Sequence, residues 1–373
     1  MKSKYDITFT GFYGQRNYGD DLFCALLAKF APEFWGAERI AFMGYDLPIA
    51  PDVRSSFLFG GRRMFKGQGQ LDYRLQPYLT DWVVCGGGSI FHSDYRSHLK
   101  GRVLAKARAR RQIKLGAIGV SVGPFQSESA RRSVEEYLKR FTFISLRDER
   151  SMDVVADFSL PDTKVVRAFD LAGMLPLVCQ PCVVNAVREK KVFGISLCGQ
   201  LPREDIAIHV KKAKMLVSRL SKVFDLKVIL YVLNTHELHG ESKLCEEFEL
   251  NPPGHEIEVV AHTGNPIATC QRFLECDSVL AVRLHAGITA GLLSIPFIQV
   301  EYHEKCSSFL DSINYSVDRR VGNLAIGDDE LFEIVMLQMQ GGETFVPDAR
   351  RLQLIELARQ NFDKTKEFFL LTD

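Results

Sequence analysis

An arginine and a histidine flank Leu284 at the end of an apolar run, and Arg283 and His285 precede a stretch of small residues. The pattern predicts a buried strand over residues 278–282 and a helix over residues 286–293. At their junction a guanidinium, an imidazole that titrates near neutral pH and an electropositive helix N-terminus would meet. Together these groups indicate an anion-binding site with acid–base capacity. The alternative is a histidine that only caps the helix.

Two further cations follow predicted strands. Arg147 comes after a strand over residues 141–145, and the rigid fork of donors on a guanidinium suits phosphate or carboxylate. A salt bridge to the adjacent Asp148 or Glu149 explains Arg147 equally well. Lys305 follows a later strand, and a lysine on a solvated loop carries little information by itself.

The N-terminal half opens with a glycine-containing turn. Gly14, Asn17 and Asp20 lie between a predicted strand over residues 6–10 and a predicted helix over residues 21–30. Glycines in this position turn the backbone and present amide groups to a phosphate or sugar at the helix N-terminus. Asp20 equally suits a plain helix cap.

A run of three glycines follows the predicted strand over residues 82–85, and it includes Gly87, Gly88 and then Ser89. Successive glycines are costly to order, so they favour a loop whose backbone approaches a ligand closely. A tight crossing with a neighbouring strand is the alternative. His92, at the end of this segment, is a further candidate for the same site.

Residues 95–127 contain no acidic side chain, and the part between residues 96 and 114 is rich in lysine and arginine. A solvated helix face accounts for such a stretch. The alternative is docking against an anionic lipid-linked glycan or a membrane surface. We therefore keep peripheral membrane association through residues 96–114 as a hypothesis.

Nine cysteines are scattered through apolar segments, as expected for buried thiols in a reducing compartment. Cys179 and Cys182 form a Cys-x-x-Cys pair, but no second Cys/His pair at suitable spacing accompanies it. We expect these two cysteines to be structural and no metal to be bound.

Short apolar runs alternate with helical patterns in two series, which is the rhythm of βαβ units. Residues 171–185, with two prolines and two cysteines, separate the series. We expect an α/β fold of two Rossmann-like, doubly wound domains facing across a cleft, a common location for a small-molecule site. The expected parts are an N-terminal domain over residues 1–178, a C-terminal domain over residues 179–345, and a helix over residues 346–373 that packs back on the domains.

Charge and hydropathy argue against some classes of function. Forty-seven basic and 46 acidic side chains give a formal net charge of +1, so no global field draws the protein to nucleic acid. The longest uncharged runs fall short of the ~20 apolar residues of a membrane span, and the N-terminus lacks the pattern of a secretory signal. We expect a cytoplasmic protein, located at the inner face of the membrane if the basic stretch docks there.

Taken in order, five motifs resemble the polysaccharide pyruvyl transferase family. They are Gly14 to Asp20, Gly86-Gly87-Gly88-Ser89, Gly119 to Pro124, Ser145 to Asp148 and Arg283-Leu284-His285. The resemblance runs from the N-terminus to about residue 310, and its most specific part is Arg-Leu-His followed by Tyr302-x-x-Lys305. The sequence departs from the family at Gly119-Val-Ser121, where members commonly have Gly-Gln-Gly or a similar polar turn.

The resemblance implies a GT-B-like fold and a reaction with phosphoenolpyruvate. In that reaction the enolpyruvyl unit moves onto two hydroxyls of one sugar in a cell-surface glycan, such as an exopolysaccharide, or in its precursor. The product is a pyruvate ketal, and phosphate is released. Phosphoenolpyruvate is then a co-substrate with no further cofactor, and the partner is a sugar acceptor, either lipid-linked or free of lipid.

Carried over to this sequence, the family's donor clamps for phosphate and carboxylate fall on Arg147 and Arg283. Leu284 becomes a backbone contact, His285 lies beside the reacting carbon, and Lys305 matches a family lysine. A histidine can exchange the proton that the methylene carbon must gain, and arginines can stabilise the departing phosphate. The candidates for acceptor contacts are the residues of the glycine motifs: Gly14, Asn17, Asp20, Gly87, Gly88, Ser89 and His92.

Two other functions would use the same architecture. A GT-B nucleotide-sugar glycosyltransferase would bind a diphosphate and a base, and a non-catalytic glycan-binding protein would release no phosphate with any acceptor. Retention of Arg147, Arg283, His285 and Lys305 argues against the non-catalytic protein, because a dead site has no physical need for these charges.

Overall fold

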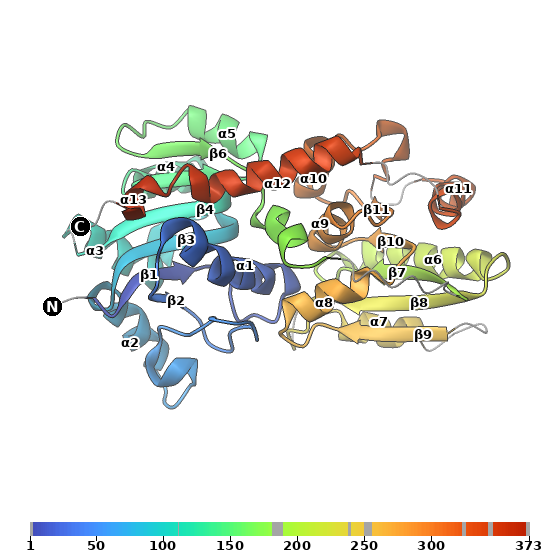
Figure 1. Ribbon diagram of the computed structural model, residues 1–373, viewed down its shortest axis with the longest axis horizontal. Helices are drawn as coiled ribbons and strands as arrows, with labels where there is room; N and C mark the ends of the chain where they lie inside the picture. The colour runs from blue at the N-terminus through green and yellow to red at the C-terminus, as the bar shows by residue number, and fades with distance from the viewer. Residues whose placement is uncertain are drawn as a thin grey trace. The chain divides into compact units, whose positions relative to one another are not determined.

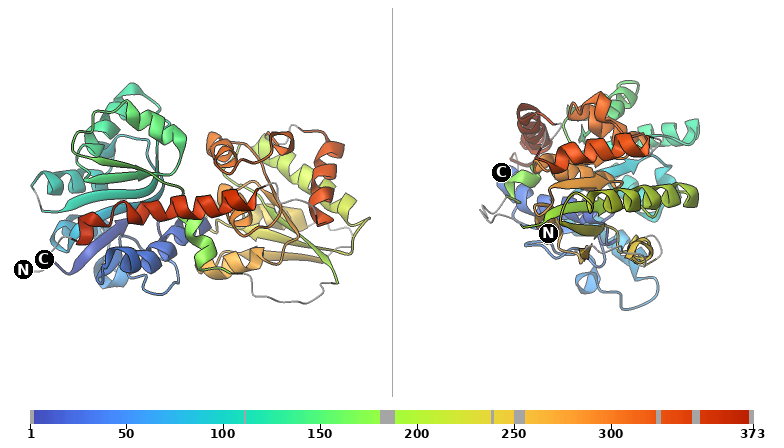
Figure 2. Two further views of the ribbon diagram at one scale, coloured as in Figure 1. Left: turned by 45° about the horizontal axis from the view of Figure 1, so that its top comes forward. Right: turned by 90° about the vertical axis from the view of Figure 1, so that its right-hand side faces the viewer.

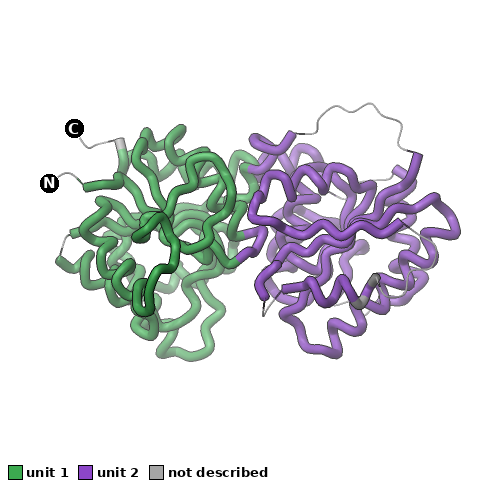
Figure 3. Tube along the Cα trace, turned by 90° about the horizontal axis from the view of Figure 1, so that it is seen from below, with its two compact units in different colours: residues 1–15, 20–174, 355–373 green, residues 16–19, 175–354 purple. Residues whose placement is uncertain are grey.

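The computed structural model describes residues 3–110, 112–180, 189–237, 240–249, 256–322, 326–341 and 346–370. The chain divides into two compact units, coloured separately in Figure 3. Unit 1 comprises residues 1–15, 20–174 and 355–373, and unit 2 comprises residues 16–19 and 175–354. The main boundary falls between residues 174 and 175. Two exchanged segments cross it: residues 16–19 group with unit 2, and residues 355–373 group with unit 1.

Unit 1 is built on a parallel sheet in the order β2-β1-β3-β4-β5-β6 (Figure 1). Its strands are β1 (Tyr5–Thr10), β2 (Ile40–Phe42), β3 (Thr80–Phe91), β4 (Lys114–Val122), β5 (Phe143–Leu146) and β6 (Lys164–Arg167). The helices between them are α1 (Tyr18–Trp35), α2 (Gln68–Leu75), α3 (Leu99–Ala109), α4 (Glu128–Leu138) and α5 (Glu149–Ala156). The 3₁₀ helices are η1 (Leu58–Gly61), η2 (Gln76–Tyr78) and η3 (Tyr95–Ser97).

Both faces of this sheet are covered, so successive strand residues are apolar rather than alternating with polar ones. On one face Val83 packs in a core with the buried side chains of α3 and α4. On the other face Trp82 contacts Phe369 of the C-terminal helix α13 (Glu367–Leu370) at a ring distance of 4.8 Å. Figure 2 shows helices on both sides of the strands.

Unit 2 repeats the plan with a parallel sheet in the order β11-β10-β7-β8-β9. Its strands are β7 (Lys191–Ser196), β8 (Leu226–Val232), β9 (Glu256–Ala261), β10 (Ser278–Ala281) and β11 (Phe297–Gln299). Its helices are α6 (Arg203–Leu220), α7 (Ser242–Glu249), α8 (Pro266–Phe273), α9 (Leu284–Leu292), α10 (Glu304–Ser312) and α11 (Asp328–Met339), with 3₁₀ helices η4 (Leu171–Leu177), which begins in unit 1, and η5 (Val317–Arg319). The predicted α/β fold with two parallel sheets is therefore confirmed.

The first exchanged segment, residues 16–19, is tied to unit 2 by backbone pairing. Asn17 forms an antiparallel bridge with Asn234, and the Tyr18 backbone N–H donates to Leu233 O at 2.8 Å. A hydrogen bond of 2.9 Å joins the Tyr18 hydroxyl to Thr289 Oγ1. These contacts explain why residues 16–19, which include the first two residues of α1, group with unit 2.

The second exchanged segment is the end of α12 (Asp348–Asp363), which belongs to unit 1 from residue 355 onward. Asn361 is fully buried there and accepts from Ser145 Oγ at 2.5 Å while its amide donates to Phe169 O at 2.8 Å. Trp35 Nε1 donates to Phe362 O at 3.2 Å. The C-terminal helical segment thus completes the hydrogen bonding of the N-terminal unit.

Candidate functional site

In each sheet the strand order reverses at one point, and open α/β sheets bind ligands beside such a point, at the carboxyl ends of the strands. In unit 2 the reversal lies between β7 and β10, which are neighbours although β8 and β9 come between them in sequence. Arg283 follows β10 directly and is the N-cap residue of α9, with φ −68° and ψ 131°. Its side chain makes no capping hydrogen bond, so its guanidinium is available for other contacts.

The guanidinium of Arg283 is oriented by Glu241. Arg283 Nε donates to Glu241 Oε1 at 2.7 Å, and Nη2 pairs with the same oxygen. The Glu241 side chain is fully buried and that of Arg283 is 11% exposed. The remaining terminal nitrogen, Nη1, lies 3.4 Å from Gln200 Oε1, after β7. The Arg283–Glu241 pair therefore lies at the strand-order reversal, and Nη1 of Arg283 points to the loop after β7.

Glu241 itself is held by the backbone of the loop after β8. Its Oε2 accepts from the Asn234 backbone N–H at 2.7 Å. Burial raises the pKa of Glu241, while Arg283 and the backbone N–H groups of Asn234 and Gly199 pull it down. No local sequence pattern singles out Glu241, because it lies 42 positions from Arg283 and only the folded sheet brings them together.

His285 lies in the first turn of α9, and its ring packs against the backbone of Gly19. A Cβ placed on Gly19 would lie 2.1 Å from His285 Nδ1, far inside contact distance. Gly19 belongs to the segment that Asn17 and Tyr18 attach to unit 2. The predicted acceptor residue Asn17 therefore has a structural role in placing the backbone beside the histidine, and its Oδ1 also accepts from the Gly19 N–H at 3.3 Å.

A buried glutamine supports the strand ends beneath α9. Gln299 Nε2 lies within hydrogen-bond distance of the carbonyl oxygens of Ala281, Val282 and Val300, at 3.1–3.3 Å. A Cβ on Gly287 would lie 2.1 Å from Gln299 Oε1, so the lack of a side chain at Gly287 lets α9 approach the sheet closely. The helix N-terminus is thereby fixed relative to β10 and β11.

Lys305 is exposed in the first turn of α10, where the His303 ring accepts from its backbone N–H. Its ammonium lies 5.8 Å from the ring centre of Tyr302. Cys198 Sγ, after β7, donates to the Tyr302 hydroxyl at 3.9 Å, and burial raises the pKa of Tyr302. Tyr302 and Cys198 thus bring the segment before α10 to the same sheet edge as Arg283.

In unit 1 the guanidinium of Arg147 joins the carboxyl ends of several strands. Nε donates to Ser121 Oγ after β4 at 2.7 Å, and Nη2 donates to Ser89 Oγ in β3 at 3.0 Å. Nη1 donates to Asp170 Oδ2, after β6, at 2.5 Å. Both partners of this ion pair are buried, with side chains 8% and 5% exposed.

The neighbours of Arg147 in sequence have other principal partners. Asp148 caps α5 by accepting from the Ser151 N–H, and its other oxygen accepts from Ser121 Oγ at 2.5 Å. Glu149 pairs with Arg167 on the surface. The main carboxylate partner of Arg147 is therefore Asp170, which no local sequence pattern singles out. A role for Arg147 in donor binding stays a prediction.

The three successive glycines lie inside β3 rather than in a loop after it. Gly86 pairs in register with Ile118 and Gly88 with Val120 of β4. A Cβ on Gly87 would lie 2.4 Å from the Phe23 ring of α1, and Gly87 and Gly88 have φ of 76° and 87°. The expectation of a loop after residue 85 is therefore wrong: the run is needed for close packing of α1 on the strand. Ser89 contacts Arg147 through its hydroxyl, and His92 Nδ1 lies 3.1 Å from Ser89 O.

The first glycine motif also has a packing role. Gly14 has φ 73°, and a Cβ there would lie 1.8 Å from Tyr45 O. Asp20 lies in the first turn of α1, and its Oδ1 would be 3.8 Å from a Cβ on Gly88. Gly88 and Asp20 therefore meet where the order of the first sheet reverses, between β1 and β3.

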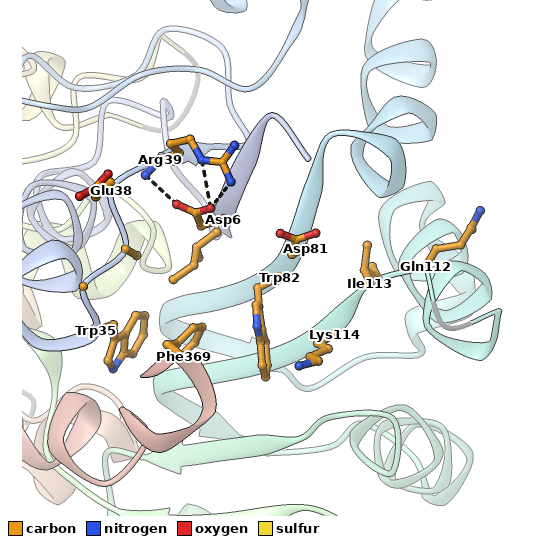
Figure 4. Close-up of a pocket in the computed structure, with 13 residues that line it drawn as sticks. Asp6, Trp35, Glu38, Arg39, Asp81, Trp82, Gln112, Ile113, Lys114 and Phe369 are labelled. Atoms are coloured by element: carbon orange, nitrogen blue, oxygen red, sulfur yellow. Dashed lines mark hydrogen bonds and ion pairs between the residues drawn. The ribbon is translucent and has the colours of Figure 1, made fainter. Parts of the chain in front are cut away.

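A pocket of about 650 Å³ lies at the opposite, amino edge of the unit 1 sheet (Figure 4). Trp82 and Lys114 line it near the starts of β3 and β4, and Asp6 in β1 is paired with Arg39 on its wall. Trp35 and Phe369 stack at a ring distance of 4.3 Å. None of the predicted site residues lines this pocket.

The basic stretch forms η3, α3 and the start of β4, and several of its cations have internal partners. Arg96 pairs with Asp94, Arg102 donates to Arg96 O, and Arg108 donates to Arg140 O. Arg111 lies outside the described residues. Within the described part of the chain, no helix is long and apolar enough to cross a membrane.

Among the residues that the structure describes, no group of three or more His, Cys, Asp or Glu side chains could hold a metal ion. Cys179 is a buried free thiol in unit 2. Cys182, its predicted structural companion, lies outside the described residues.

The sequence matches the family model described as polysaccharide pyruvyl transferase over residues 17–304, most of the chain. The matched segment includes Glu241 and Arg283, at the strand-order reversal of unit 2, and ends just before Lys305. No curated protein matches the sequence.

Solved structures with a similar fold include a putative UDP-N-acetylglucosamine 2-epimerase from Listeria monocytogenes, with 9% identity and a TM-score of 0.57 over 98% of this chain and 94% of that chain. The UDP-N-acetylglucosamine 2-epimerase from Neisseria meningitidis has 12% identity and a TM-score of 0.54 over 94% and 98%. An Anabaena protein in complex with UDP and glucose has 14% identity and a TM-score of 0.52 over 98% and 97%. At these identities the likeness shows the fold, and the predicted GT-B-like pair of Rossmann-like domains is confirmed.

Proposed function

Because the chain belongs to the polysaccharide pyruvyl transferase family, we propose that it moves the enolpyruvyl unit of phosphoenolpyruvate onto two hydroxyls of one sugar. The acceptor is a cell-surface glycan or its precursor, and phosphoenolpyruvate serves as the co-substrate without a further cofactor. The products are a pyruvate ketal and inorganic phosphate.

The reaction has three changes that side chains can assist. A proton is added to the methylene carbon of the enol, and one sugar hydroxyl forms a C–O bond to the adjacent carbon while losing its proton. A second hydroxyl then forms the other C–O bond, the bond to the phosphate oxygen breaks, and the second proton leaves with phosphate. The first step requires an acid and a base at the donor, and the last requires cations that stabilise phosphate.

The observation that carries the proposal is the pairing of Arg283 with Glu241 directly beside His285, at the N-terminus of α9. The buried carboxylate fixes the direction of the guanidinium, so the arginine is positioned for an anion before the anion binds. The α9 N-terminus adds a favourable field for negative charge. His285, in the same helical turn, is the general acid or base of the proposal.

Further contacts complete the assignment. Arg147 and Arg283 clamp the phosphate and carboxylate of the donor, Leu284 contacts it through its backbone, and Lys305 assists protonation or departure of phosphate. Arg147 is already bonded to Ser89, Ser121 and Asp170, so any donor contact uses the donor hydrogens that these partners leave.

The proposal identifies the acceptor only by its class. Family membership supports a sugar or polysaccharide acceptor, and we propose that the candidates Gly14, Asn17, Asp20, Gly87, Gly88, Ser89 and His92 lie near it. A lipid-linked acceptor, a cytoplasmic location and peripheral membrane association belong to the same proposal.

The direct test is phosphate release from phosphoenolpyruvate with a panel of lipid-linked, nucleotide-linked and polymeric sugars, with mass spectrometry of the product. We expect acceptor-dependent release of phosphate and a product heavier than the acceptor by one pyruvate ketal. Transfer of a sugar from a uridine or guanosine diphosphate sugar instead would overturn the proposal. So would the absence of any release in the presence of an acceptor that the protein binds.

A further inference from the structure

Unit 1 exposes a loop, residues 59–66, that combines large apolar side chains with cations. Phe59 is 58% exposed, Met64 64% and Phe65 50%. Arg62, Arg63 and Lys66 lie between or next to them in sequence and are exposed as well. Figure 1 shows this segment at the lower edge of the view, beside α2.

The loop is also free of negative charge. No carboxylate occurs between Asp52 and Asp72, and Asp72 is fully buried. Among the described residues, neither Arg62 nor Lys66 has an ion-pair partner, whereas Arg63 stacks over the Tyr45 ring at 4.6 Å. The exposed surface of the loop is therefore both apolar and cationic.

Buried polar side chains hold the loop in one conformation. Gln68 is 1% exposed, its Oε1 accepts from the Met64 N–H at 2.7 Å, and its amide donates to Arg62 O at 2.8 Å. Asp72 accepts from the Leu58 N–H at 2.9 Å and from the Tyr45 hydroxyl. These hydrogen bonds fix the loop backbone, and the apolar side chains of the loop lie outside the core.

Phe59 has a backbone conformation that is unfavourable for a phenylalanine. Phe59 has φ 54° and ψ 30°, in the left-handed region that a bulky side chain rarely adopts. Its ring contacts Phe65 edge to face, at 6.4 Å. Because glycine or asparagine would fit this conformation better, folding of unit 1 alone gives no reason for an exposed phenylalanine here.

A surface of this kind matches one partner chemistry. Aromatic and thioether side chains enter the boundary between headgroups and acyl chains, and lysine and arginine beside them attract anionic headgroups. The basic stretch 96–114 supplies cations, but among the described residues no large exposed apolar side chain lies between Tyr78 and Val165. Stable attachment requires both contributions, and the loop provides both.

We propose that residues 59–66 dock unit 1 on the surface of an anionic lipid bilayer. Phe59, Met64 and Phe65 enter the interface, and Arg62 and Lys66 contact lipid phosphates. This docking assigns the membrane contact to residues 59–66 rather than to the basic stretch 96–114. It does not depend on the proposed reaction, because it uses none of the residues assigned to the donor.

The test is co-sedimentation of the full chain with vesicles of phosphatidylglycerol and phosphatidylcholine, compared with vesicles of phosphatidylcholine alone. We expect binding to the anionic vesicles that weakens as salt is raised. Phe65→Ser should lower the binding constant about tenfold or more. Arg62→Gln and Lys66→Gln should each lower it about fivefold. The matched controls Lys211→Gln and Lys222→Gln, exposed cations of unit 2 outside the basic stretch, should change it less than twofold.

Phe59→Asn separates docking from folding. It should weaken vesicle binding while the free energy of unfolding stays the same or rises, because asparagine tolerates the left-handed backbone. Phosphate release with a water-soluble acceptor should stay at the wild-type rate in all the loop variants, so failure of the reaction and failure of docking give different results. The proposal is overturned if the wild type does not bind anionic vesicles, or if Phe65→Ser binds them as strongly as the wild type. It is also overturned if the loop variants instead abolish a concentration-dependent dimer seen by analytical ultracentrifugation.

Discussion

Glu241 Oε1 accepts hydrogen bonds from both Nε and Nη2 of Arg283, although the two residues lie 42 positions apart. The carboxylate is fully buried, and its second oxygen is occupied by a backbone N–H. The arginine beside His285 is therefore a positioned group rather than a mobile surface cation. Glu241 acts on the site through Arg283.

Substitution of Arg283 should show how strongly an unpaired, buried Glu241 carboxylate destabilises the fold. Arg283→Met should lower the free energy of unfolding of the chain by about 3–5 kcal/mol, because it leaves Glu241 buried without its partner. The double variant Arg283→Met/Glu241→Gln should recover a large part of this loss, because the buried charge is gone. Urea unfolding followed by circular dichroism measures both. Losses in the double variant that equal the sum of the single ones would show that the pair is not coupled.

The same variant should be more sensitive to pH than the wild type. Burial already raises the pKa of Glu241 in the folded protein, and loss of Arg283 removes the main opposing charge, so the folded pKa rises further. A raised folded pKa means that the folded state prefers the neutral carboxyl, so stability is retained below the unfolded pKa of about 4.3 and lost as pH rises through the folded pKa. Arg283→Met should therefore lie closer to the wild type near about pH 5 than near about pH 8. An equal difference at both values would contradict a buried, charged Glu241.

Gly19 should be required for the placement of the His285 ring. In Gly19→Ala the new Cβ would lie 2.1 Å from His285 Nδ1, so the ring or the backbone must move. We expect kcat for ketal formation to fall about 10–100-fold, because small displacements of a reacting group are costly in rate. Gly322→Ala is the matched control, since a Cβ there meets nothing within 4 Å. A wild-type kcat in Gly19→Ala would mean that the ring position is unimportant for the reaction.

Arg147 should stabilise unit 1 whether or not it binds the donor. Arg147→Lys cannot reproduce the separate bonds to Ser89, Ser121 and Asp170. The free energy of unfolding should fall by about 1.5–3 kcal/mol, as for lost hydrogen bonds to a charged group. Arg167→Lys, in an exposed pair on the neighbouring strand β6, should change it by less than about 0.5 kcal/mol. Equal effects of the two substitutions would refute the linking role of Arg147.

Local sequence patterns were sufficient for part of this structure. The apolar run before Arg283 predicted a strand that ends at the tripeptide, and β10 and α9 lie there. The alternation of strands and helices predicted two parallel sheets, because each element buries its own apolar face. The identity of the anion, by contrast, came from family resemblance and not from spacing.

Contacts that depend on sheet order were not predictable from local patterns. Glu241 and Asp170 meet their arginines only because neighbouring strands end at one edge, and no periodicity encodes that pairing. The glycine run looked like a loop because glycine weakens strands in general. In the fold it stays in β3, since α1 approaches so closely that Phe23 leaves no room for a side chain at Gly87.

We propose that His285 transfers the proton that the methylene carbon of phosphoenolpyruvate gains. The most direct measurement is the rate of pyruvate ketal formation by His285→Gln at saturating phosphoenolpyruvate, alongside calorimetric binding of the donor. We predict that kcat falls by about 10²–10⁴-fold, with donor affinity changed much less. Turnover near the wild-type rate at saturating donor would contradict the assignment.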